Sequence, residues 1–98
     1  MTGESIRKTV CITNPQGFHM RPMAAFVEAA NRYPCAVTVA REGVPPANGK
    51  SILALMGLVA VQGTELIIEV TGPRAAEALQ ALIGVLQHTY DDEHEPAV

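Results

Sequence analysis

The sequence predicts an α+β fold in which one antiparallel or mixed sheet has helices over one of its faces. The first observation is the order of the apolar patterns, which predict four strands and three helices in the order β-α-β-β-α-β-α. The second is composition, since 98 residues, 48% of them hydrophobic and only 4% aromatic, suffice for one aliphatic core. The third is that Thr38, Glu65 and Glu69 occupy polar positions within strands, so the other sheet face can stay in water.

The first strand and the first helix are separated by a turn. Residues 7–13 are rich in Thr, Val and Ile, which favour strands, and the run stops at the turn-forming residues 14–17. Residues 20–32 then place apolar side chains three and four positions apart, which predicts a helix. Pro22 fits its first turn, where a missing N–H costs no helical hydrogen bond.

The second and third strands are predicted from different signals. Residues 35–40 alternate, with Cys35, Val37 and Val39 on one face. Residues 41–48 contain a glycine and two adjacent prolines, which predict a turn followed by a short, irregular strand. Because prolines lack the N–H donor, this strand can lie only at an edge of the sheet or in a loop.

The last three elements are a short helix, a strand and a longer helix. Residues 51–58 predict the short helix, with Ser51 as its N-cap. Residues 64–71 give the clearest strand, since three large aliphatic side chains share one face. A glycine and a proline break this strand, and the final helix begins at Pro73 or Arg74.

Composition and charge narrow the classes of function. We expect a single domain over residues 1–98, with its core at about residues 6–88 and a flexible polar tail at residues 89–98. The formal net charge is −3 and basic residues do not cluster, which argues against nucleic-acid binding. No apolar run reaches the roughly 18 residues of a membrane span, and no signal-peptide pattern opens the chain. We therefore expect a cytoplasmic protein that does not insert into membranes.

The number of cysteines agrees with a cytoplasmic location. Disulfides are rare in the cytoplasm, so Cys11 and Cys35 are expected to be small, buried, unbridged side chains. Neither cysteine has a partner at the spacing of zinc ligands. The sequence therefore predicts no metal site.

His19 is the strongest candidate for chemistry. It stands at the start of the predicted helix, where the positive end of the helix disfavours imidazolium and keeps the ring neutral and nucleophilic. The first backbone N–H groups of a helix also bind anions, and the Arg21 guanidinium pairs well with phosphate oxygens. The pattern fits a nucleophile inside a phosphate-binding loop. From position alone, a simple capping role explains His19 equally well.

Ser51 is the second candidate. A serine at an N-cap usually serves only as a cap, although a phosphoryl group on Ser51 would also be favourable at a helix N-terminus. The neighbouring Ile52, Leu53, Leu55 and Met56 are too many apolar residues for the inner face of a two-turn helix. Some of them must be exposed, which predicts a docking surface.

Two segments carry a resemblance to a known family. Residues 14–26 read NPQGFHMRPMAAF and are similar to the active-site motif of the HPr family. Its members are the histidine-containing phosphocarriers of the bacterial phosphoenolpyruvate-dependent sugar phosphotransferase system. Residues 48–58 read NGKSILALMGL and resemble the regulatory-serine motif of that family. The resemblance implies an open-faced β-sandwich, with a four-stranded antiparallel sheet and three helices on one face.

The resemblance also implies a chemistry. His19 would accept a phosphoryl group on Nδ1 from phospho-enzyme I and pass it to an EIIA component, with Arg21 stabilising the phosphate. The protein would be a carrier and not an enzyme and would need no cofactor. A carrier that visits several partners is most simply a monomer. Ser51 would be the target of an ATP-dependent HPr kinase/phosphorylase. The apolar residues expected to bind partners lie around the two motifs and are Phe18, Met20, Met23, Ile52, Leu53 and Met56.

Two alternative functions stay open at this point. One is a nitrogen-type phosphocarrier, which regulates and does not feed transport. The other is a Crh-like regulatory protein that acts through Ser51 and protein interaction. The Arg21-Pro22 pair favours the sugar branch, because nitrogen-type relatives often lack that proline, and His19 argues against a purely Crh-like role. The sequence does not identify the sugar or the EII partners.

Overall fold

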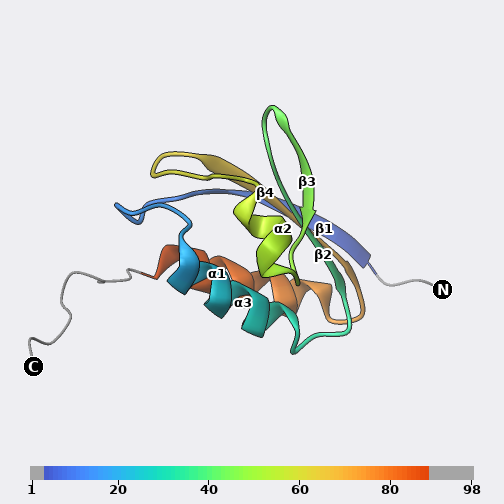
Figure 1. Cartoon of the computed structure of the whole chain (residues 1–98). Helices are drawn as coiled ribbons and strands as arrows, with labels where there is room; N and C mark the ends of the chain where they lie inside the picture. The colour runs from blue at the N-terminus through green and yellow to red at the C-terminus, as the bar shows by residue number, and fades with distance from the viewer. Residues whose placement is uncertain (1–3, 89–98) are drawn as a thin grey trace, which may run out of the picture.

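The computed structural model describes residues 4–88, which form one sheet with helices on one side (Figure 1). The order of elements is βαββαβα, as predicted. The elements are β1 (Glu4–Cys11), α1 (Met20–Ala30), β2 (Ala36–Arg41), β3 (Val44–Asn48), α2 (Ile52–Met56), β4 (Glu65–Gly72) and α3 (Ala75–Gln87). The predicted flexible tail, residues 89–98, lies outside the described residues.

The sheet is antiparallel throughout, with strand order β1-β4-β2-β3. Strand β4 lies between β1 and β2, so that Val10 faces Leu66 and Val39 faces Ile68 across the ladder. Leu66, Ile68 and Val70 have no exposed surface. They are buried because β4 has a strand on each side and helices over one face.

Helices α1 and α3 cover the inner face of this sheet. Figure 1 shows them side by side, with α2 close to β3. Phe26 of α1 and Leu82 of α3 are fully buried in the core between the two layers. Thr38 and Glu65 are exposed on the outer face, which stays open. The arrangement places the start of α1 at the rim of the molecule, after the loop that leaves β1.

The two edges of the sheet differ. Strand β3 is an edge strand and contains the exposed Pro45 and Pro46, as predicted from their missing donors. Its register against β2 shifts between Val39 and Arg41. Strand β1, at the other edge, begins before the predicted position 7, because Glu4 already faces Gly72 of β4. That pairing depends on a segment distant in sequence, which local propensity does not reveal.

The two cysteines are free thiols, but the expectation that both are buried was wrong for one of them. Cys35 is buried, and its Sγ donates a hydrogen bond to the Pro73 carbonyl at 2.9 Å. Cys11 is exposed, because successive strand residues point to opposite faces and its neighbour Val10 occupies the core side. Within residues 4–88, no helix is long and apolar enough to cross a membrane.

Candidate functional site

His19 lies at the N-cap of α1, as the sequence predicts. Its backbone is extended, with φ −97° and ψ −165°, and its carbonyl accepts the hydrogen bond of the Met23 N–H at 2.9 Å. The amides of Met20 and Arg21 precede that first helical hydrogen bond, and Pro22 has no N–H. The first turn contains no acidic residue, and the His19 side chain makes no capping bond. This helix end therefore keeps its positive character for an external anion.

The His19 ring is only partly accessible. The residue is half-buried, and its Nε2 atom is among the buried side-chain atoms. An approaching group cannot reach Nε2 directly, because that ring nitrogen is buried.

The loop before His19 is held against a second segment. Gly17 has φ +76°, and a Cβ at this position would lie 2.7 Å from the Ala60 carbonyl oxygen. The Phe18 N–H donates to that same carbonyl at 2.8 Å. Glycine is needed here both for its left-handed backbone and for this close approach. The loop therefore holds His19 in a fixed position at the start of α1.

Two residues predicted to bind partners are buried, and that part of the prediction was wrong. Phe18 is 6% exposed and packs edge-to-face on Phe26, with ring centroids 5.8 Å apart. Met23 is also 6% exposed and belongs to the core. The tie between Phe18 and Ala60 turns the phenyl ring inward, and Met23 lies on the inner side of α1. Neither side chain is available on the surface.

The other predicted docking residues are at the surface. Met20, Leu53 and Met56 are exposed, Leu53 by 80%, while Ile52 is half-buried. The structure adds two exposed side chains that were not predicted from the sequence. The apolar patch, as we define it, consists of Met20, Leu53, Met56, Val59 and Val61.

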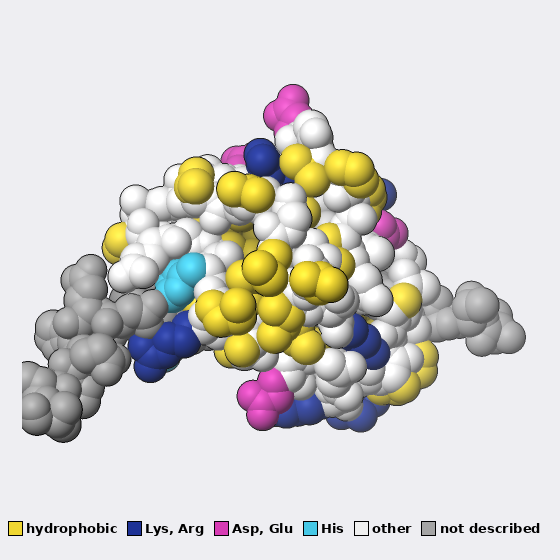
Figure 2. Space-filling view, viewed as in Figure 1, with side chains coloured by type: hydrophobic (Ala, Val, Ile, Leu, Met, Phe, Trp, Pro, Cys, Tyr) yellow, Lys and Arg dark blue, Asp and Glu magenta, His cyan; other side chains and the backbone are white. Residues whose placement is uncertain are grey.

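Figure 2 shows hydrophobic side chains gathered on one face, with a histidine and basic side chains beside them. Arg21 is exposed two residues after His19. Val59 and Val61 could have been noticed in the sequence because they belong to a run of four apolar residues, 58–61, between Gly57 and Gly63. Val59 also has φ +47°, a left-handed backbone that β-branched residues rarely adopt.

Ser51 is the N-cap of α2, and this prediction is confirmed. Its Oγ accepts a hydrogen bond from the Ala54 N–H at 3.1 Å. The adjacent Lys50 Nζ donates to the Tyr33 carbonyl at 2.8 Å, which connects the start of α2 to the turn that follows α1. Ser51 is half-buried and immediately precedes the helix that carries Leu53 and Met56.

A hollow of about 740 Å³ lies away from His19, on the open face of the sheet, and its lining residues are Thr9, Ala40, Arg41, Glu42, Thr64, Glu65 and Ile67. Within residues 4–88, no three His, Cys, Asp or Glu side chains come together as a metal site would require. His19 keeps part of its surface exposed, and a protein partner can approach it there.

Comparison with known proteins agrees with this geometry. Residues 6–88 match the family described as "PTS HPr component phosphorylation site". The phosphocarrier protein HPr of Pseudomonas aeruginosa is 41% identical over 83 residues, covering 85% of this chain and 92% of that protein. The phosphocarrier protein NPr of Escherichia coli is 30% identical over 89 residues, covering 91% of this chain and 99% of that protein. The crystal structure of HPr from Bacillus anthracis has a TM-score of 0.79 at 34% identity and covers 85% of this chain and 98% of its own.

Proposed function

This chain belongs to the HPr family of phosphocarriers of the phosphotransferase system, and we propose that it carries a phosphoryl group on His19 from phospho-enzyme I to EIIA components. Members of this family are carriers and not catalysts. The observation that carries the proposal is the start of α1, where His19 adjoins a helix end that has no acidic residue and no side-chain cap. Such an end can accept a phosphoryl oxygen on its backbone N–H groups.

The transfer conserves atoms and charge in each direction. The lone pair of the neutral His19 Nδ1 attacks the phosphorus of a phosphohistidine on enzyme I. The donor's N–P bond breaks, and its electron pair returns to the donor ring nitrogen. In a second exchange of the same kind, a nucleophile of EIIA attacks the phosphorus, the His19 N–P bond breaks, and its electron pair returns to Nδ1. Phosphoryl transfer needs little covalent catalysis from the carrier, so the positioning of the reacting groups and the stabilisation of charge decide the rate.

Arg21 would supply the positive charge that pairs with the phosphoryl group. It is exposed and lies two residues beyond His19 on the first turn of α1. A guanidinium can donate two parallel hydrogen bonds to phosphate oxygens, which an ammonium group cannot match in geometry. We assign it the role of stabilising both the transferring group and the phosphorylated histidine.

The apolar patch would bind the partner proteins. Met20 adjoins His19 in sequence, and Leu53 and Met56 lie on α2. Flexible methionine side chains suit a surface that must fit more than one partner. Hydrophobic contact around a polar centre would exclude water while the phosphoryl group moves.

We assign regulation by an ATP-dependent HPr kinase/phosphorylase to Ser51. A phosphoryl group there would add nearly two negative charges immediately before Leu53 and Met56. Such charge next to an apolar docking surface opposes its desolvation, so partner binding would weaken. Phosphorylation of Ser51 would then lower the rate of phosphoryl transfer through His19 without modifying the histidine itself.

The nitrogen branch is the second candidate function. It is supported by the 30% identity to NPr over nearly that whole protein. The Arg21-Pro22 pair supports the sugar branch. We propose that this protein acts as a monomer in the cytoplasm, which accords with its two free cysteines.

Radiolabelled phosphoenolpyruvate with enzyme I provides the test. Wild-type protein should acquire an acid-labile, alkali-stable phosphate, and His19→Ala should acquire none. Equal labelling of the His19→Ala variant would refute the assignment. With HPr kinase and ATP, wild type should be labelled and Ser51→Ala should not, while Ser51→Ala still accepts phosphate from enzyme I. Parallel reactions with sugar-branch and nitrogen-branch enzymes I separate the two functions by rate.

A further inference from the structure

Asn14 is the one polar or charged side chain that is buried among the described residues, with 5% of its surface exposed. It lies in the loop between β1 and α1, five positions before His19. Removing an amide from water is unfavourable unless it is hydrogen-bonded. Its presence at the edge of an aliphatic core therefore indicates a specific structural task.

One half of the Asn14 amide closes a turn. Its Nδ2 donates to the Gly17 carbonyl at 3.1 Å, and the Gly17 N–H donates to the Asn14 carbonyl at 2.8 Å. These two reciprocal bonds fix both ends of residues 14–17. On its other side, Gly17 lies against the backbone of Ala60 and Val61. The glycine is therefore held from both directions.

The second polar atom of the Asn14 amide, its oxygen, lacks a hydrogen-bond donor among the described residues. The Asn14 Oδ1 is buried and accepts no hydrogen bond from residues 4–88. A buried acceptor without a donor costs at least as much free energy as one ordinary hydrogen bond returns. Asn14 thus contributes little net stability, and an unsatisfied buried group of this kind calls for another explanation.

The turn that Asn14 closes leads directly to the candidate phosphoryl acceptor. The chain passes from Gly17 through Phe18, whose N–H is bound by Ala60, to the extended N-cap at His19. We propose that Asn14 is a positioning residue for phosphoryl transfer, because by holding Gly17 it fixes the direction in which the His19 imidazole leaves the loop. This inference rests on the proposed role of His19 as the phosphoryl carrier. A misplacement of about 1 Å in such a reaction can lower the rate by about 100-fold.

Two substitutions test the role by rate. Asn14→Ala removes both polar atoms of the amide, whereas Asn14→Leu keeps the size and branching of the side chain but loses the donor to Gly17. Both should slow phosphoryl uptake from phospho-enzyme I by about 10- to 100-fold, while KM for enzyme I stays within about twofold because the apolar patch is intact. The thermal unfolding midpoint of Asn14→Ala should change little. Should that variant fail to fold, Asn14→Leu decides the question.

A matched control separates positioning from stability. Val70 is fully buried in β4, where it faces Ile6 and Val37. Val70→Ala should lower the unfolding midpoint and leave the rate at 25 °C unchanged. If Val70→Ala slows uptake as much as Asn14→Ala, or if both Asn14 variants react at the wild-type rate, the proposal is wrong.

A second readout does not depend on phosphoryl transfer. In the unphosphorylated protein, Asn14→Ala should shift or broaden the ¹H–¹⁵N signals of the His19 ring, while amide signals of β3 stay in place. Unchanged His19 signals overturn the positioning role whatever the labelling assay gives. A wild-type protein that never accepts phosphate would instead contradict the proposed function, and the two failures are thereby distinguished.

Discussion

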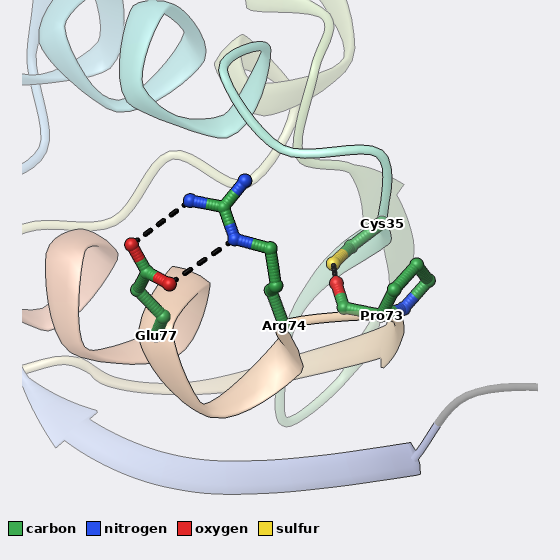
Figure 3. A network of polar contacts seen from close by, with 4 residues as sticks. All are labelled: Cys35, Pro73, Arg74 and Glu77. Carbon is green, nitrogen blue, oxygen red and sulfur yellow. Dashed lines mark hydrogen bonds and ion pairs between the residues drawn. The ribbon is translucent and has the colours of Figure 1, made fainter.

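The N-termini of the two long helices differ in one respect that matters for function. Helix α3 begins after Arg74, which has a left-handed backbone, and Figure 3 shows the guanidinium paired with Glu77 in the first turn. The two hydrogen bonds are 3.1 and 2.9 Å long. Helix α1 begins after His19 and has no acidic residue in its first turn. The carboxylate of Glu77 offsets the positive end of α3, whereas α1 keeps its end for another anion.

Helix α2 shows a third solution within the same chain. Its N-cap Ser51 satisfies one amide through its own hydroxyl, so the end is capped but not charged. Three helix starts in one domain thus carry a carboxylate, a hydroxyl or neither. Under the proposed function, the helix start that would accept the phosphoryl group is the one without a local acid or side-chain cap.

Giving α1 an acid like that of α3 should produce the largest effect. Met20→Asp places a carboxylate in the first turn, where it occupies the positive field and repels the incoming phosphoryl group. We expect uptake from phospho-enzyme I to fall by about 100- to 1000-fold, since like charges a few ångströms apart repel by about 3–4 kcal/mol near a protein surface. Stability should rise by about 0.3–1 kcal/mol.

The matched control for that variant is Met20→Asn. It loses the same apolar side chain but adds no charge. Rapid-quench labelling of both variants separates loss of docking from repulsion. Equal rates for the two would contradict the electrostatic explanation.

Removing the basic side chain at the same helix start should produce the next effect. Arg21→Ala should slow transfer by about 30-fold, because a hydrogen bond to a charged group contributes about 1.5–3 kcal/mol. Its unfolding midpoint should stay near that of wild type, since Arg21 is exposed. Arg21→Lys should recover only part of the rate. A loss of stability large enough to explain the lost activity would refute this role.

Substitutions at Ser51, the N-cap of α2, should change the stability of the protein and not its rate of phosphoryl transfer. Ser51→Ala removes the acceptor of the Ala54 N–H and should lower the free energy of unfolding by about 1 kcal/mol. Ser51→Asp retains a capping oxygen and should recover most of it. Urea unfolding of the three proteins measures the difference. If Ser51→Ala is as stable as wild type, the hydroxyl is not an effective cap.

Removing the carboxylate at the start of α3 should give the smallest effect. The hydrogen bond from Arg74, and then its charge, lower the pKa of Glu77. A carboxylate with a lowered folded-state pKa contributes stability at pH values above its ordinary pKa and loses it as the pH falls through the lowered value. Glu77→Gln should therefore be slightly less stable than wild type at neutral pH and equal to it in acid. Both side chains are exposed, so salt should shrink the difference. A gap that persists in acid would contradict the ionic origin.

Local patterns were sufficient for much of the fold. The element order, the edge position of the proline-containing strand and the capping role of Ser51 followed from residue types and spacing. The placement of His19 at the start of α1 followed from Pro22 and from the apolar spacing behind it. These features depend on neighbours within a few positions along the chain, so the sequence contains the information.

The exposure of single side chains was less predictable. Phe18 and Met23 looked like surface residues beside the histidine, yet both are buried. The direction of Phe18 is set by Ala60, a residue more than forty positions away. The exposed Val59 and Val61 belong to that same distant segment. No local pattern contains such a contact.

The sequence by itself determined that this protein is a small α+β domain with a histidine and an arginine at the start of its first helix. Backbone propensity and apolar spacing depend on residues that are close together in the chain, so they can be recognised from the sequence. Only the tertiary structure decided which apolar side chains face a partner, which ring nitrogen of His19 is buried, and why Asn14 lies where it does. Those properties arise when the loop before α1 packs on the segment around Ala60, and packing joins residues that are far apart in the chain.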